Sequence, residues 1–345
     1  MAAEQRGIVG YFKSHPILLL LILTPGIPEY LTGSSALNNI ILNPPLFLFE
    51  LVANLCLYGP GVLLIREAKV RWHKGWATVL LLGAAYGILE EGIALSTLYN
   101  SHAGPVGQLG FYGHWLGVNW IWTVAIVVVH MIYSISLPIL LLGLALPETN
   151  GKSLLKTDRS IAWTFGILTF DVFSLLLVIR FGEHFWMGTP VFLGSLAAIG
   201  LFIYLARKAP ANVLIPKKVK PTIRPPGMGV IGALFYPTVL IVEFVGRGAK
   251  LPPAGDFVLV ILDQALYLAL VLRVISRSNN ERHLVAFAAG LLVPIGLFGY
   301  VSEIKLPLSL LAVAIAVALL WMLWRKYPKS NQTVEDPRVD PPLLQ

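Results

Sequence analysis

Two adjacent glutamates, Glu90 and Glu91, stand in the apolar stretch Gly75–Asn100, which is long enough to form a membrane-spanning helix. Acidic side chains at membrane depth are costly, and they usually face a protein interior or a wet cavity and take part in function. Neighbouring residues of an α-helix point about 100° apart, so the two carboxylates are expected on adjacent helix faces. The pair predicts a site that uses carboxylate chemistry, either as a general base or in binding a proton or cation.

A histidine in the next long apolar stretch is the natural partner of this pair. His130 shares a polar stripe with Asn119, Thr123 and Ser134, since these positions fall within about 60° of one another at 3.6 residues per turn. It lies about eight residues, roughly 12 Å, below the tryptophans around Trp122, which are typical of a membrane interface. That depth is close to the depth expected for the glutamates.

A second stripe, Glu50, Asn54 and Tyr58, recurs at every fourth residue of an earlier apolar stretch. A glutamate pair, an imidazole and an asparagine at similar depth could supply a general base, its orienting partner and an oxyanion donor. Polar side chains at membrane depth also hydrogen-bond simply to join helices, which is the competing interpretation. The candidate catalytic residues are Glu90, Glu91, His130 and Asn54. The candidate substrate- or ion-binding residues are Glu50, Asn119, Thr123, Ser134 and Asp263. No metal or cofactor is expected.

The composition indicates which elements must position these groups. The chain of 345 residues is 56% apolar and only 13% charged, which is too apolar for a soluble domain. Stretches long enough to cross about 30 Å of hydrocarbon recur along it. We therefore predict an all-α polytopic membrane helix bundle. The ten predicted spans are Pro16–Ser35, Pro45–Arg66, Gly75–Leu98, Trp122–Leu146, Ile161–Ile179, Thr189–Ala206, Met228–Gly246, Phe257–Ile275, His283–Val301 and Leu306–Trp324.

The charge pattern orients the bundle. With a cytoplasmic N-terminus, all 26 basic residues except Arg180, Arg247, Lys250 and Lys305 fall on the inner side, as the positive-inside rule requires. Both termini are then cytoplasmic. The net charge of +8 is explained by insertion and by the anionic inner leaflet, so membrane lipids and not nucleic acid are the expected partners. We expect a multi-pass protein of the plasma membrane.

This topology also places the membrane-depth acids. All except Asp171 fall in the outer half of their helices, which predicts a water-accessible acidic vestibule open to the outside. They are Glu29, Glu50, Glu90, Glu91, Glu243 and Asp263. The bundle is expected to span 1–329, with an inner loop, 208–227, separating the first six helices from the last four. A polar, Pro-rich tail, 330–345, is expected to be a disordered cytoplasmic segment.

Two short segments resemble the superfamily of CAAX-protease-like membrane glutamic peptidases, including its PrsW-like branch. They are Gly83-Ala-Ala-Tyr-Gly-Ile-Leu-Glu90-Glu91-Gly92 and His130-Met-Ile-Tyr-Ser134, within about 50 residues of the chain. The resemblance implies that Glu90 or Glu91 activates water to cleave a peptide bond, assisted by His130. Two family features are missing, because position 95 is Leu where the larger branch has Arg, and no later His-x-x-x-Asn motif lies on a membrane helix.

Three functions remain open from the sequence. The first is a membrane-embedded glutamic endopeptidase-like hydrolase that cleaves a membrane-anchored protein near the outer face. The second is a proton- or sodium-coupled secondary transporter of a small solute, with Glu90, Glu91 and Asp263 as coupling sites. The third is a non-catalytic scaffold whose polar stripes bind partner helices.

Overall fold

The computed structural model describes residues 8–211, 223–275, 281–302 and 308–327, and these are almost entirely helical. The α-helices are α1 (Ile8–Ser14), α2 (Pro16–Pro25), α3 (Asn39–Leu42), α4 (Pro44–Arg71), α5 (Trp76–Gly87), α6 (Trp120–Val129), α7 (Leu137–Ala145), α8 (Asp158–Gly182), α9 (Thr189–Lys208), α10 (Pro225–Gly248), α11 (Pro253–Ile275), α12 (Glu281–Ser302) and α13 (Leu308–Lys326). The predicted all-α helix bundle is confirmed.

Eight helices within the described residues are long and apolar enough to cross a membrane, as expected of an integral membrane protein. The first predicted span corresponds to a shorter apolar helix, Pro16–Leu31, and the seventh to the 24-residue α10. The count of ten and the cytoplasmic placement of both termini stay predictions. The tail 330–345 and most of the inner loop 208–227 lie outside the described residues.

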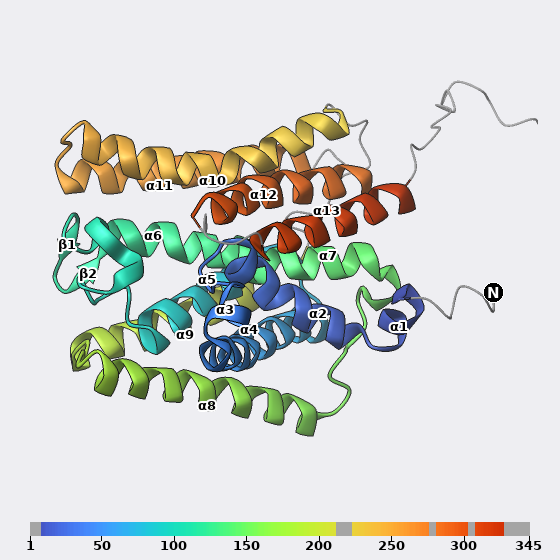
Figure 1. Ribbon diagram of the computed structural model, residues 1–345, viewed down its shortest axis with the longest axis horizontal. Coiled ribbons are helices and arrows are strands. Elements are labelled where there is room, and N and C mark those ends of the chain that lie inside the picture. The colour runs from blue at the N-terminus through green and yellow to red at the C-terminus, as the bar shows by residue number, and fades with distance from the viewer. Residues whose placement is uncertain (1–7, 212–222, 276–280, 303–307, 328–345) are drawn as a thin grey trace, which may run out of the picture.

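The helices divide into an enclosed centre and a lipid-facing periphery (Figure 1). In an 18-residue window of the central span Trp76–Ala94, 78% of the residues are buried, against 11% in the corresponding window of Thr189–Lys208. The peripheral helix α8 exposes large apolar side chains such as Trp163, Phe170 and Phe181. Such a surface would cause aggregation in water but is stable in contact with lipid hydrocarbon. The exposed apolar faces therefore independently support a membrane location.

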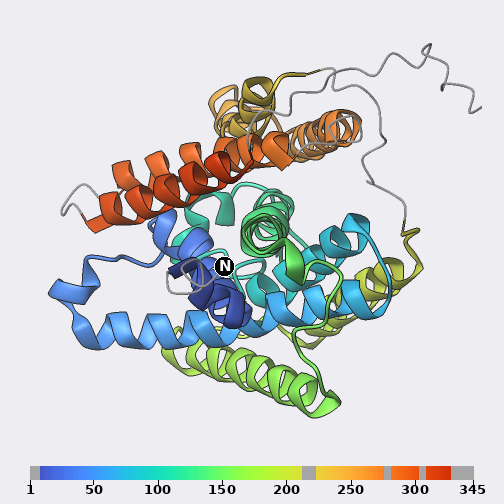
Figure 2. The ribbon, with the colours of Figure 1, turned by 90° about the vertical axis from the view of Figure 1, so that its right-hand side faces the viewer.

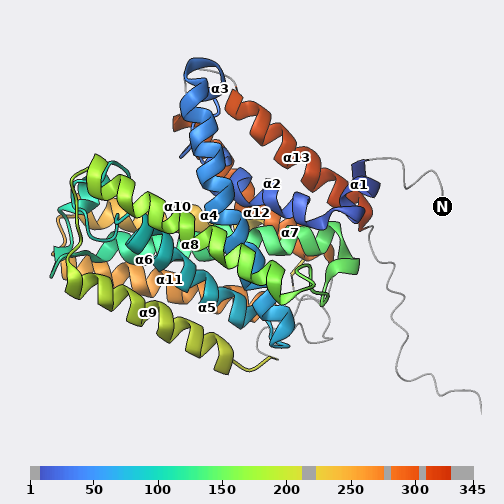
Figure 3. The ribbon, with the colours of Figure 1, turned by 90° about the horizontal axis from the view of Figure 1, so that it is seen from below.

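Seen from below, α4 crosses α8 obliquely, and the side view shows α8 on the outer side of α4 (Figures 2 and 3). The connection between α5 and α6 is compact. It contains a 3₁₀ turn, η3 (Gly104–Gly110), and an antiparallel two-stranded ribbon of β1 (His114–Trp115) and β2 (Val118–Asn119). This connection lies at the end of the bundle opposite α1 (Figure 1).

Three helices are interrupted by π-helical segments, in which the backbone bonds reach one residue further than in an α-helix. They are η1 (Gly26–Leu31) after α2, η2 (Ile88–Ala94) after α5, and η4 (His130–Ser136) between α6 and α7. Such segments are rare and occur often at functional sites. Each of the three carries a titratable side chain at membrane depth: Glu29, Glu90 with Glu91, and His130.

A buried ion-pair network closes the end of the bundle at which α4 ends. Glu67 accepts from Arg66 at 3.2 Å, from the Ser153 hydroxyl at 2.5 Å and from the Leu154 amide at 2.7 Å. Arg66 also donates to the Thr149 carbonyl oxygen at 2.6 Å. A buried charge is tolerated when it is paired and hydrogen-bonded, so this network fixes the 147–155 connection to α4.

A close helix contact among the described residues of the C-terminal half joins α10 to α12 through glycines. A Cβ added at Gly290 would collide with the carbonyl group of Gly229 and would lie 2.8 Å from the Ala233 amide nitrogen. Small residues at such a contact let two membrane helices pack backbone to backbone.

We therefore expect Gly290→Ala to lower the free energy of unfolding by about 1–3 kcal/mol, because the added methyl group forces α10 and α12 apart. The measurement is unfolding of the purified protein in mixed micelles, followed by tryptophan fluorescence. Gly194→Ala is the matched control, since a Cβ there meets no heavy atom within 4 Å. Equal effects of the two substitutions would contradict the close contact.

Candidate functional site

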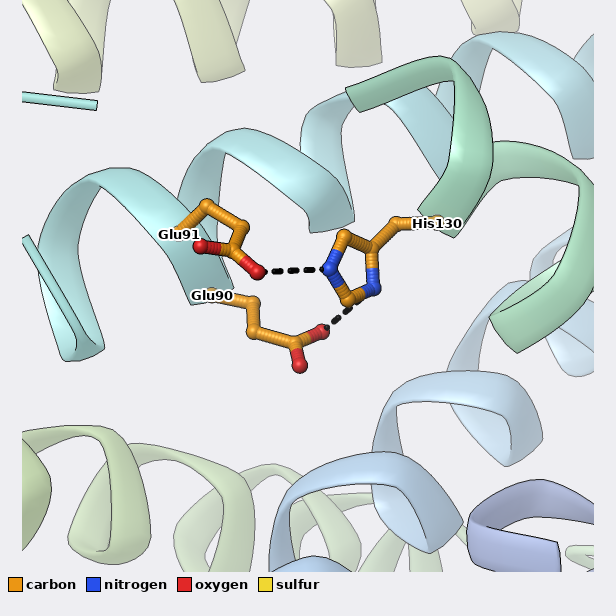
Figure 4. A group of neighbouring side chains, drawn as sticks. All are labelled: Glu90, Glu91 and His130. Atoms are coloured by element: carbon orange, nitrogen blue, oxygen red, sulfur yellow. Dashed lines mark hydrogen bonds and ion pairs between the residues drawn. The ribbon is translucent and has the colours of Figure 1, made fainter. Parts of the chain in front are cut away.

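Glu90, Glu91 and His130 meet in the interior of the bundle (Figure 4). The Nε2 atom of His130 lies 2.8 Å from Oε1 of Glu91, and the Nδ1 atom lies 3.2 Å from Oε2 of Glu90. The three residues are 1%, 6% and 5% exposed, respectively. The imidazole therefore lies between two carboxylates, and the sequence correctly paired residues that are 39 positions apart.

The π-helical turn of η2 explains how two successive glutamates reach one ring. A π turn holds more residues than an α turn, so the angle between neighbouring side chains is smaller than 100° and both can face the same partner. The bond from the Leu95 amide to the Glu90 carbonyl oxygen, 2.8 Å, has the five-residue spacing of this geometry. Gly87 lets the helices approach, because a Cβ there would lie 3.3 Å from the Cβ of His130.

One ring nitrogen of His130 and one carboxylate are held in place by further groups. The Ser134 hydroxyl lies 2.9 Å from Nδ1 of His130, one helical turn along η4. The Thr97 hydroxyl donates to Oε2 of Glu91 and accepts from Nε1 of Trp122 at 3.1 Å. Glu91 is thus bound at both oxygens, whereas Oε2 of Glu90 makes the ion-pair contact with His130 but no hydrogen bond in the part of the chain that the structure describes.

A third carboxylate, Glu29 of η1, joins the cluster through Tyr58. The Tyr58 hydroxyl donates to Oε1 of Glu29 at 2.5 Å, and its ring lies nearly parallel to the His130 ring with a centroid distance of 6.3 Å. Ser35 donates to the other oxygen of Glu29 at 2.8 Å. The apolar helix Pro16–Leu31 therefore packs against the site through a polar contact as well as through its apolar face.

The structure separates the remaining predicted residues from the centre of the cluster. Asn54 donates to the Ser35 hydroxyl at 3.0 Å, and Glu50 accepts from Asn39 at 3.3 Å, so this stripe joins α4 to the N-terminal segment. The Thr123 hydroxyl is buried without a partner among the described residues. Asp263 lies on α11, where it accepts from Gln264 at 2.8 Å.

Asn119 corrects one detail of the predicted stripe. It lies in β2, before α6 begins, and not on the helix that carries His130. Its amide donates to the Thr97 carbonyl oxygen at 2.8 Å and its Oδ1 lies 2.6 Å from Nδ1 of His114. The connection that begins after η2 folds back over Thr97. Asn119 belongs to the β-ribbon of this connection and therefore lies outside the helix. Asn119 therefore supports a residue that holds Glu91 and does not reach the cluster itself.

The predicted open vestibule is also corrected. Glu90 and Glu91 are enclosed, and pairing with His130 replaces the water that was expected to solvate them. Glu243 lies in α10, at a position whose side chain is outside the described part. Asp171 of α8 is buried with one oxygen, Oδ2, unpartnered among the described groups.

Thr97 and Trp122 are the contacts that the sequence did not single out. Thr97 follows the helix in an irregular turn, where no period relates it to Glu91. For Trp122, the sequence predicts only a position at the membrane interface.

The cluster has the donor set of a cation site. Glu90, Glu91 and His130 each offer one ligand atom, and these atoms lie within 4.8 Å of one another. Two carboxylates and one imidazolium leave one negative charge, which a proton would balance. With the imidazole neutral, a divalent cation would balance the two carboxylates. Three protein ligands also match hydrolytic zinc sites. The expected absence of a metal therefore stays a prediction.

No protein-family model, no curated protein and no solved structure matches this chain significantly.

We expect His130→Ala to lower the free energy of unfolding by about 3–5 kcal/mol, because it leaves two buried carboxylates without their shared partner. Adding Glu90→Gln and Glu91→Gln to the same variant should recover much of this loss, since neutral amides cost less to bury than charges. Unfolding in mixed micelles measures both effects.

The control is His102→Ala, which removes an exposed imidazole in the η3 connection and should change stability by no more than about 0.5 kcal/mol. If the triple variant is as unstable as His130→Ala alone, the charge pairing is not what stabilises the site.

Proposed function

We propose that this integral membrane protein is a membrane-embedded hydrolase of the glutamic endopeptidase type, acting on the peptide bond of a membrane-anchored protein. The observation that carries the proposal is the direct contact of His130 with both Glu90 and Glu91 inside the bundle. The resemblance to CAAX-protease-like and PrsW-like peptidases rests on these same three residues and agrees with it.

Glu90 is the better candidate for the general base, because one of its oxygens has no hydrogen bond within the described chain. Glu91 is bound by His130 and Thr97, which suits a residue that orients the imidazole. Asn54, the asparagine among the expected catalytic residues, and Asn119 are engaged elsewhere. An N–H of protonated His130 is the nearest replacement for the role of oxyanion donor.

The proposed step balances with these groups alone. As the water oxygen bonds to the carbonyl carbon, one water proton passes to Glu90 and the carbonyl electron pair moves to its oxygen, which accepts a hydrogen bond from His130. The carbon–nitrogen bond then breaks, and the proton on Glu90 passes to the leaving amine. A carboxylic acid and an amine are the products.

Burial sets a requirement on this mechanism. Glu90 is 1% exposed, so substrate and water reach it only after neighbouring groups move. The connection 95–119 contacts Glu91 through Thr97 and lies at one end of the bundle (Figure 1). It is the segment whose displacement would admit an extended peptide.

Proton-coupled transport is the second candidate, and the placement of Glu29 favours it. A third carboxylate at a π-helical break, joined to the cluster by Tyr58, resembles the broken helices that hold coupling sites in carriers. Asp263 was expected to take part in coupling, but it lies on α11 away from these contacts.

Glu90→Gln is expected to reduce cleavage by about 10²–10⁴-fold, because the amide cannot accept a proton from water. New protein N-termini would be profiled in membranes of cells that express the wild type or the variant at equal levels. Glu50→Gln is the matched control, since it neutralises a membrane-depth acid outside the cluster and should leave cleavage unchanged.

Identical N-terminal profiles for wild type and Glu90→Gln would overturn the hydrolase assignment. The transport alternative is tested separately, in proteoliposomes that contain a pH-sensitive dye. Proton flux in the wild type that is lost in Glu29→Gln, without any cleavage, would establish transport instead.

A further inference from the structure

A polar pocket lies at the opposite end of α4 from Glu50, where α4 turns into α5. It is a cavity of about 160 Å³, and we call it the basic pocket. It is lined by Arg66, Lys69, His73, Lys74, Asn150 and Gly151. Three of these side chains, two lysines and an arginine, carry a positive charge when protonated, and a fourth is an imidazole. None of these residues belongs to the Glu90–Glu91–His130 cluster.

The positive charge of the basic pocket is only partly balanced. Glu67 pairs with Arg66, but it is also bound by Ser153, Leu154 and the Arg71 side chain. In the described chain, Lys69, His73 and Lys74 have no carboxylate within 4.0 Å. An excess of cations around a cavity attracts an anion.

The two lysines keep hydrogen-bonding capacity for such an anion. Lys69 places its ammonium 4.4 Å from the centre of the Trp76 ring, a contact that orients the group without using its N–H donors. The Lys74 ammonium donates to the Ala209 carbonyl oxygen at 2.9 Å, which leaves two of its three donors. Arg66 is held rigidly by Glu67 and the Thr149 carbonyl oxygen.

The position of the basic pocket decides the class of anion. Lys69 lies two residues before α4 ends and Lys74 two residues before α5 begins, and both helices are candidate membrane spans. The pocket therefore lies at a membrane face, and the charge pattern predicts that this is the cytoplasmic face. Lipid phosphates occupy that level, and basic pockets between membrane helices are suited to them.

We propose that the basic pocket binds a phosphate group, that of an anionic lipid headgroup or a free phosphate, between Lys69, Lys74 and Arg66. This site is independent of the proposed hydrolase activity. A phosphate bound there contacts α4, the turn into α5 and the 147–155 connection at the same time.

The test uses the purified full-length protein, with lipid binding followed by native mass spectrometry. The probes are phosphatidylglycerol and phosphatidylcholine with identical acyl chains. The variant Lys69→Gln with Lys74→Gln should weaken phosphatidylglycerol binding by about 10- to 30-fold, the effect expected for two cations near a membrane surface, and leave phosphatidylcholine binding unchanged. Lys152→Gln with Lys156→Gln is the matched control, because it removes two exposed lysines of a neighbouring loop.

A second arm identifies the source of the phosphate. If inorganic phosphate raises the unfolding temperature of the wild type but not of Lys69→Gln with Lys74→Gln, and no lipid preference exists, the site takes free phosphate. Lys69→Arg with Lys74→Arg keeps both charges and should bind as the wild type does, which separates loss of charge from loss of folding. Equal binding by the glutamine and control variants, or no response of the wild type to either probe, would overturn the proposal.

Discussion

The cost of placing charge inside a membrane protein governs the centre of this structure. Two carboxylates and an imidazole are stable there only because each lies against an opposite charge or a hydrogen-bond donor. That requirement draws η2 and η4 together, brings Thr97 back over Glu91, and fixes Tyr58 between His130 and Glu29. Apolar packing around the cluster supplies the bulk of the stability but leaves many arrangements open, and the polar contacts select one of them.

The same constraint explains why irregular helix geometry collects at one place. An unbroken α-helix would send Glu90 and Glu91 to different faces, and one of them would face lipid or an apolar neighbour. A π turn replaces the regular α-helical hydrogen bonds by less common ones that span five residues, but it lets both carboxylates share one partner. In η4 it carries His130 and Ser134, and in η1 it begins at Gly26, directly after Pro25, where the helix is already weakened.

Much of the fold could be predicted from the sequence because membrane helices are recognised by their length and apolar composition. The pairing of His130 with Glu90 and Glu91 was also predictable, since depth along two helices can be counted from their ends. Asn119 and Thr97 were not, because irregular connections have no period and their folding depends on tertiary contacts. The enclosure of the glutamates was missed for a related reason: sequence shows that a charge is present, but not whether a protein group or water neutralises it.

The π-helical segment η4 also changes how the surface of its span should be read. One additional residue in a turn shifts the phase of everything that follows, so the side of α6 that meets its neighbours before His130 is not continuous with the side of α7 that does so after Ser136. This membrane span therefore behaves as two short helices whose outward-facing stripes are offset from each other. Tolerance to polar substitution measured on one side of the break does not carry over to the other.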